Sequence, residues 1–264
     1  MDSNTRTSPS IVLVPGYWLG AWAWDAVAAD LRDRGYHVTA ITLPGLDPDD
    51  AHRASTTLAQ QADALRSAVD AAAADGSSVV LVAHSGAGYP TSVLLDRALT
   101  AVARVVYVDS GPSADGSACD ASVPPEQQEV PLPPFEQLEA SIDGLSEEDL
   151  MRFRERAVPE PGSVMREPVH LCNDSRRDVP ATIIACSLPS EVMMQMAHEG
   201  HPMMAEVATL RDLGLIDLPT GHWPGWSRPA DLAAAIATAA ATDQTALTEY
   251  RLPAWTCPGE QPRE

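Results

Sequence analysis

The chain has 264 residues, and 45% of them are hydrophobic, which is enough to bury the core of one large α/β domain. The 17 basic and 37 acidic residues give a formal net charge of −20, and a charge of that sign repels nucleic acid and anionic membrane surfaces. Every basic residue is an arginine, so reactions that form a Schiff base on a lysine, including those of pyridoxal phosphate, are excluded.

The N-terminal segment, MDSNTRTSPS, is polar and has no apolar stretch of the kind found in signal peptides. No later segment approaches the ~18 to 20 consecutive apolar residues that are needed to span a bilayer. The four cysteines lie far apart without a CxxC pair, which indicates free thiols rather than a zinc site or a disulfide framework; they are Cys119, Cys172, Cys186 and Cys257. We therefore expect a cytoplasmic protein.

Strand and helix patterns alternate over the first 112 residues. A short apolar run at 11–14 ends at Pro15-Gly16 and predicts a strand, and an amphipathic helix at 22–34 follows it. The same alternation continues with strands expected at 37–43, 79–83 and 104–108, a helix at 57–74 and another that runs to about Leu99. Continuous apolar strands such as 79–83 are typical of a parallel sheet that helices cover on both faces.

The composition then changes sharply. Residues 113–178 are rich in proline and charge, and we expect two helices there, at 134–142 and 146–157. The second begins with Ser146, a favoured N-cap residue, and has Asp149 at the capping-box position. We interpret this stretch as a helical cap inserted between two strands of the sheet.

Strands and helices resume after the insertion. The expected elements are a strand at 182–186, one or two Met-rich helices at 190–211, a strand at 213–218 and an Ala-rich helix at 229–241. Such alternation specifies an α/β fold with a mostly parallel sheet covered by helices on both faces. The predicted organisation is a core of residues 1–112 and 179–241, a cap of 113–178 and a C-terminal extension of 242–264.

The strand at 79–83 runs directly into the segment His84-Ser85-Gly86-Ala87-Gly88. A nucleophilic serine on a sharp strand-to-helix turn needs small residues two positions before and after it, and Ala83 and Ala87 meet that requirement. The backbone N–H of Gly86, at the start of a helix, can stabilise a developing oxyanion. Ser85 is therefore the candidate nucleophile.

Two loops carry the expected partners of Ser85. The segment TGHWP follows the last predicted strand, and from it His222 can act as the general base. The loop after the first strand contains Tyr17, whose backbone N–H is the expected second oxyanion donor. Trp18 and Trp223 flank these loops and are expected to wall an apolar substrate pocket.

Four segments within residues 10–241 carry a resemblance to a known family: VPGYWLGAWAW, TLPG, VAHSGAG and TGHWPGWSRP. With the order serine, acid, histidine, the chain resembles the α/β-hydrolase superfamily, and in particular its compact esterase and hydroxynitrile-lyase branch. The resemblance implies that Ser85 is the nucleophile and His222 the base. Pro15 departs from the pattern, because the family commonly has a histidine before the glycine of the oxyanion loop.

The acid of the expected triad has two candidates. The family's usual position follows the strand at 182–186, where this chain has no carboxylate before Glu191. Other members place the acid after the strand that follows the nucleophile's helix, and there this chain has Asp109. We favour Asp109 and keep Glu191 as the alternative. Either carboxylate would accept the Nδ1–H of His222 and fix its tautomer.

Two further patterns concern metal and substrate. His198 and His201 are three positions apart with a glycine between them, so they lack the spacing of the HExxH zinc motif, and no metal is expected. The methionines of the 190–211 stretch could line an adaptable substrate cavity, but packing in the core is the preferred interpretation; they are Met193, Met194, Met196, Met203 and Met204.

The sequence therefore predicts a serine hydrolase that cleaves a small apolar ester, thioester or lactone through an acyl-enzyme on Ser85, without a metal or an organic cofactor. An acyltransferase or a cofactor-free lyase with the same triad is one alternative, since the pocket rather than the triad selects the acceptor. A non-catalytic ligand-binding protein of the same fold is the other, and it would be favoured if neither Asp109 nor Glu191 reached His222.

Overall fold

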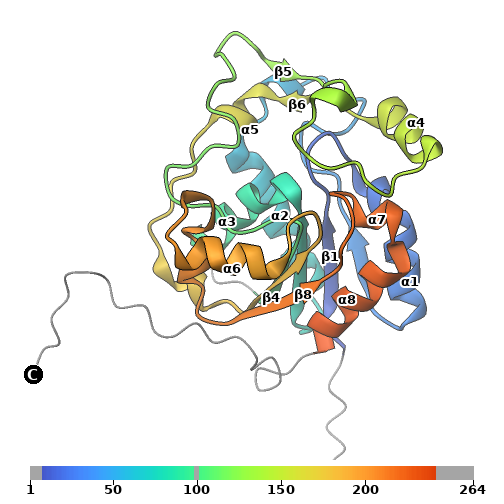
Figure 1. The fold of residues 1–264 in the computed structure, drawn as a ribbon, viewed down its shortest axis with the longest axis vertical. Coiled ribbons are helices and arrows are strands. Elements are labelled where there is room, and N and C mark those ends of the chain that lie inside the picture. Colours follow the sequence, from blue (N-terminus) through green and yellow to red (C-terminus); the bar gives the residue numbers. More distant parts are fainter. Residues whose placement is uncertain (1–7, 98–100, 242–264) are drawn as a thin grey trace, which may run out of the picture.

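A six-stranded parallel sheet forms the centre of the molecule (Figure 1). The computed structural model describes residues 8–97 and 101–241. The strands are β1 (Ser10–Val14), β2 (Val38–Ala40), β3 (Val79–His84), β4 (Val102–Val108), β7 (Ala181–Ala185) and β8 (Leu213–Asp217), in the order β2-β1-β3-β4-β7-β8. Every neighbouring pair is parallel, which confirms the predicted sheet.

Helices cover both faces of the sheet (Figure 1). On one face lie α1 (Asp25–Asp33) and α8 (Pro229–Ala241), and on the other lie α2 (Leu58–Ala72), α3 (Gly88–Arg97) and α6 (Ser190–His198). The side chains of β3 alternate between the two cores, with Val79, Leu81 and Ala83 beneath α2 and α3 and with Val80 and Val82 beneath α1 and α8. The continuous apolar run of this strand is explained by burial on both faces.

Local signals set the start of several helices. Thr57 caps α2 in a capping box with Gln60, in which each side chain binds the backbone N–H of the other residue. The Met-rich stretch predicted as one or two helices contains α6 followed by two 3-10 turns, at Pro202–Met204 and Val207–Thr209. Beyond α6, Met204 is buried against the core cluster, and Met203 is exposed.

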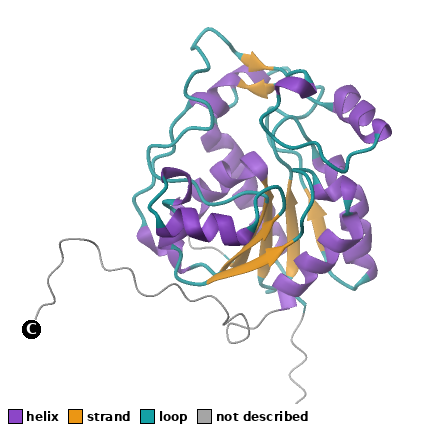
Figure 2. Ribbon diagram, viewed as in Figure 1, coloured by secondary structure: helices purple, strands orange, loops and turns teal. Residues whose placement is uncertain are grey.

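The segment between β4 and β7 is mostly loop, as Figure 2 shows. Its elements include β5 (Glu129–Val130), α4 (Glu147–Arg156), β6 (Glu160–Pro161) and α5 (Gly162–Arg166), and β5 pairs with β6 as a short antiparallel ribbon. Ser146 and Asp149 form the expected capping box of α4. In Figure 1 the ribbon and α4 lie beyond the carboxyl ends of the central strands.

The prediction of a helix at 134–142 is wrong. Only a 3-10 turn at Phe135–Gln137 forms there, and Leu138 is already extended. Every second residue from this point packs in the same apolar cluster, namely Leu138, Ala140 and Ile142. Such a spacing suits an extended chain, whereas a helix would turn these side chains in different directions. Tertiary packing therefore decides the local structure.

The predicted C-terminal extension, 242–264, lies outside the described residues, and so does Cys257. Cys119, Cys172 and Cys186 are free thiols. Among the described helices, none is long and apolar enough to cross a membrane.

Candidate active site

Ser85 lies at the turn between β3 and α3. Its φ of 53° is a left-handed conformation that costs a non-glycine residue ~1–3 kcal/mol and persists only where the surroundings hold it. Two glycines allow the necessary close packing: a Cβ atom at Gly16 would lie 2.8 Å from the Ser85 Cβ, and one at Gly86 would lie 2.3 Å from the Tyr17 ring. The loop after β1 therefore packs directly on the Ser85 turn.

Three of the predicted residues form one hydrogen-bonded chain. Nε2 of His222 lies 2.7 Å from Oγ of Ser85, and Nδ1 of His222 lies 2.6 Å from Oδ2 of Asp109. Because a carboxylate only accepts hydrogen bonds, the neutral imidazole carries its proton on Nδ1 and accepts the Ser85 hydroxyl proton on Nε2. The three side chains follow β3, β4 and β8, whose carboxyl ends meet at one edge of the parallel sheet.

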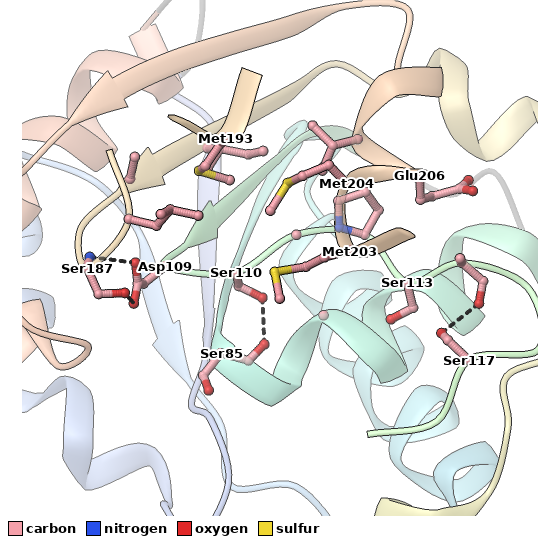
Figure 3. A pocket seen from close by; sticks show the side chains of 18 of the residues that line it. Ser85, Asp109, Ser110, Ser113, Ser117, Ser187, Met193, Met203, Met204 and Glu206 are labelled. Atoms are coloured by element: carbon pink, nitrogen blue, oxygen red, sulfur yellow. Dashed lines mark hydrogen bonds between the residues drawn. The ribbon is translucent and has the colours of Figure 1, made fainter. Parts of the chain in front are cut away.

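The end of β7 holds the Asp109 carboxylate (Figure 3). Ser187 donates its hydroxyl to Oδ2 over 2.6 Å and its backbone N–H to Oδ1 over 2.8 Å, and the Cys186 N–H lies 3.2 Å from Oδ1. Burial by itself raises the pKa of Asp109, but the hydrogen bond and charge of His222, together with the Ser187 donors, outweigh it and lower the pKa to about 2. Glu191, the alternative acid, is exposed in the first turn of α6.

Hydrogen bonds fix the backbone of His222 on two sides. Its N–H donates to the Ser141 carbonyl over 2.8 Å, and its carbonyl accepts from Nε2 of His84 over 2.7 Å. Burial of His84, reinforced by the neighbouring His222 imidazole, lowers the pKa of His84 to about 3 and keeps this ring neutral. His84 thus supports the loop of the candidate base, a role that its position beside Ser85 in the sequence did not reveal.

The two predicted oxyanion donors lie beside Ser85. Gly86 is the next residue in the chain, and the ring of Tyr17 packs against it. Trp18 follows Tyr17 and has a φ of 64°. The Trp18 N–H is already bound by the Glu160 carboxylate over 3.1 Å. Tyr17 and Gly86 therefore remain the candidate donors.

A cavity of about 520 Å³ opens beside Ser85 and His222. Sites for small molecules have volumes of ~300–1,000 Å³. The walls of the cavity beside Ser85 are largely apolar and include Ile183, Leu188, Met193, Met203, Met204 and Val207. Figure 3 shows the three methionines across the cavity from Ser85. Core packing, the preferred prediction for the five methionines, holds for Met193 and Met204, which are buried beside the sheet and line the cavity as well. Met194 and Met196 are partly buried against the same cluster, whereas Met203 is 67% exposed and does not follow the prediction.

Among the described residues that line the cavity, the charged side chains are all carboxylates. Among the described residues that line it there is no arginine, and Glu139 and Glu206 join Asp109 there. Glu206 is neutralised by Arg176 and Arg177, whose nitrogen atoms lie 2.8 Å and 3.0 Å from its Oε1. The wall therefore provides no arginine to pair with an anionic substrate.

The predicted pocket walls Trp18 and Trp223 do not line this cavity. Trp223 is buried beside His222 and packs with Leu19 and Phe153. The indole N–H of Trp18 donates to the Val130 carbonyl of the insertion over 3.0 Å. Both rings anchor the two loops from outside the cavity.

His198 and His201 lie at the end of α6 and just beyond it, and both are exposed. Nδ1 of His201 accepts the Met203 N–H over 3.2 Å and so caps the next 3-10 turn. In the part of the chain that the structure describes, no group of three or more His, Cys, Asp or Glu side chains could hold a metal ion.

Known proteins share sequence and fold with this chain. The family model described as the alpha/beta hydrolase family matches residues 11–235. The "Probable hydrolase R7" of Phoma sp. is 27% identical over 245 residues, which cover 88% of this chain and 98% of that protein. The "Esterase PIR7B" of Oryza sativa subsp. japonica is 34% identical over 112 residues, 41% of each chain. The structure of the methylesterase protein MES16 from Arabidopsis has a similar fold, with a TM-score of 0.68, 19% identity and coverage of 88% of this chain and 98% of that chain.

Proposed function

The chain belongs to the alpha/beta hydrolase family, and we propose that it is a serine hydrolase that cleaves a carboxylic ester, a thioester or a lactone through an acyl-enzyme on Ser85. The observation that carries this proposal is the continuous hydrogen-bonded chain from Ser85 through His222 to Asp109, with links of 2.7 Å and 2.6 Å. The names of two relatives, an esterase and a methylesterase, support an ester as the bond that is cleaved.

In the first half of the proposed reaction, Oγ of Ser85 attacks the substrate carbonyl while Nε2 of His222 takes the hydroxyl proton. Asp109 stabilises the imidazolium that forms, because its low pKa keeps it ionised at neutral pH. The backbone N–H groups of Tyr17 and Gly86 stabilise the oxyanion of the tetrahedral intermediate. His222 then gives its proton to the leaving oxygen or sulfur, and the acyl group stays on Ser85.

Water completes the proposed cycle. Nε2 of His222 removes a proton from a water molecule, whose oxygen attacks the acyl carbon. The second tetrahedral intermediate then collapses, the carboxylic acid is released and the proton returns to Oγ of Ser85. The apolar walls of the cavity suit uncharged acyl groups, and this match supports the expectation of a small apolar substrate.

Fluorophosphonate labelling tests this proposal, because these reagents react with an activated serine. We expect a stoichiometric adduct on Ser85 that is lost in Ser85→Ala and in His222→Ala. Ser117→Ala is the matched control, since Ser117 lines the same cavity but donates its hydroxyl to the Ala114 carbonyl, and it should label like the wild type. Folded wild-type protein without an adduct on Ser85 would refute the acyl-enzyme mechanism.

A further inference from the structure

Trp18 is bound to the insertion through all three of its polar groups. Its backbone N–H donates to Oε2 of Glu160 over 3.1 Å, its carbonyl accepts the Val158 N–H over 3.0 Å, and its indole N–H donates to the Val130 carbonyl over 3.0 Å. Val130 and Glu160 are partners in the β5–β6 ribbon. The loop after β1 and the insertion are therefore joined at this residue.

The position of Trp18 matters because of the residue that precedes it. Trp18 has a φ of 64°, a left-handed conformation that a tryptophan adopts only where neighbouring contacts hold it. The Trp18 N–H belongs to the peptide group that follows Tyr17, so a contact that fixes this peptide restrains rotation about the Cα–C bond of Tyr17. The N–H of Tyr17, one of the two proposed oxyanion donors, belongs to the preceding peptide group. The two peptide planes meet at the Cα of Tyr17, so a contact that holds the second plane limits how far the first can turn away from Ser85.

Glu160 is an uncommon residue for the place that it occupies. It is only 1% exposed, on a two-residue strand of the insertion. The Trp18 N–H donates to its carboxylate, and the nearby side chain of Gln61 also favours the ionised form; both groups are neutral. Burial therefore raises the pKa of Glu160 to about 7. An apolar side chain would fill this space more favourably, but it could not accept the Trp18 N–H, and a carboxylate is a particularly strong acceptor.

We propose that Glu160 is a positioning residue, which holds the Tyr17 N–H in line with Ser85 by binding the N–H of Trp18. The insertion then does more than line part of the cavity, since one of its carboxylates sets the geometry of the oxyanion hole from outside. This inference rests on the proposed function, because it concerns the same reaction. It adds that transition-state stabilisation depends on a contact between the core and the insertion.

Variants of Glu160 separate this role from simple anchoring of the insertion. Glu160→Leu removes the acceptor, and Glu160→Gln keeps an acceptor oxygen without the charge. Glu129→Leu is the matched control, because it makes the same change on the paired strand β5, where the side chain is 40% exposed. The readouts are kcat and KM on an aryl ester and the inhibition constant of a trifluoromethyl ketone, whose oxyanion would occupy the hole when its hemiketal forms on Ser85.

We expect kcat to fall ~10–100-fold in Glu160→Leu with KM changed less than about threefold, because removing an oxyanion donor outright costs ~10²–10³-fold in kcat. The ketone should lose affinity by the same factor as kcat. Glu160→Gln should recover most of the loss, and Glu129→Leu should match the wild type. A folded Glu160→Leu with wild-type kcat, or a Glu160→Gln as impaired as Glu160→Leu, would overturn the inference.

Glu160→Asp decides the question if Glu160→Leu does not fold. It keeps the charge but is shorter by one methylene, which withdraws the carboxylate from Trp18, so kcat should fall below that of Glu160→Gln. Wild-type kcat in Glu160→Asp would again overturn the inference. A wild-type enzyme that fails to label at Ser85 would instead refute the proposed function, so the two failures can be told apart.

Discussion

At the residue scale, the acid of the proposed triad depends on a serine from another strand. Ser187, at the end of β7, gives the Asp109 carboxylate two hydrogen bonds, of 2.6 Å and 2.8 Å. These bonds orient the carboxylate toward His222 and favour its ionised form. In the resemblance to the family, the end of this strand is the usual place for the acid. Here the proposed acid, Asp109, follows β4, and the end of β7 supports it.

Ser187→Ala removes the hydroxyl donor and leaves the backbone donor in place. We expect kcat/KM on an aryl ester to fall ~10-fold, because a hydrogen bond to a charged group contributes ~1.5 kcal/mol. Ser190→Ala is the control, since it breaks a serine–aspartate bond of the same length, 2.6 Å, to Asp217. Equal rates in the two variants would contradict the role of Ser187.

Asp109→Asn tests the acid directly. We expect a loss of ~10⁴-fold in kcat, because an amide would donate to His222 and stabilise the wrong tautomer. Glu191→Gln should keep wild-type activity, since Glu191 is exposed on α6. Rates are compared on the same aryl ester after circular dichroism has shown that both variants fold. Small and equal losses would remove Asp109 from the triad.

Ser85 and His222 could be predicted because the residues next to them in sequence are typical of the turn and loop that they occupy. For the acid, the sequence favours Asp109 but keeps Glu191 as an alternative, since the choice depends on which strand end faces the imidazole. Ser187 and His84 carried no such signal. Their contacts join residues 78 and 138 positions apart, and only the folded chain brings these together.

At the scale of elements, Glu160 makes the stability of the fold depend on pH. Its pKa is about 7 in the folded protein against an ordinary value of 4.5, so between these values the folded state holds a proton that the unfolded chain releases. The stabilising contribution of this group is fully present below pH 4.5 and is lost as the pH rises through about 7. Glu160→Gln has no such proton, and its stability relative to the wild type should therefore increase from pH 5 to pH 8.5.

Urea unfolding at these two pH values measures the difference, which amounts to at most ~1.4 kcal/mol per pH unit for one proton. His84 acts in the opposite sense, since its low pKa weakens folding as the pH falls below 6.5. That contribution is shared by the wild type and the variant, so their difference isolates Glu160. Glu129→Gln should follow the wild type. Parallel pH dependence of the wild type and Glu160→Gln would contradict a raised pKa.

The elements of the core could be predicted better than those of the insertion. Strands such as β3 are continuous apolar runs bounded by turn residues, and helices such as α2 begin at a recognisable cap. The ribbon of β5 and β6 has only two residues in each strand, which is too short to give a periodic pattern. The helix expected at 134–142 does not form, because packing in the apolar cluster with Leu19 and Trp223 favours an extended chain over the local helical preference.

At the scale of the whole molecule, charge should select among substrates. The net charge is −20, and among the described residues that line the cavity there is no arginine. A substrate with a free carboxylate would be repelled at a distance and would find no arginine partner in the cavity wall. We expect the phenyl ester of butanoic acid to have a kcat/KM at least ~10-fold above that of the monophenyl ester of succinic acid, with a smaller ratio at high salt. A preference for the anionic ester would contradict the prediction that the cavity disfavours anionic substrates.

Acyl transfer through Ser85 is the step on which the other inferences depend. Rapid acid quench during turnover of an aryl ester, followed by mass mapping of peptides, measures it directly. We predict that the acyl group is found on the peptide that contains Ser85, appears with the first release of phenol and disappears when the substrate is exhausted. Steady turnover with no acyl group on that peptide, or undiminished turnover in Ser85→Ala, would contradict the proposed mechanism.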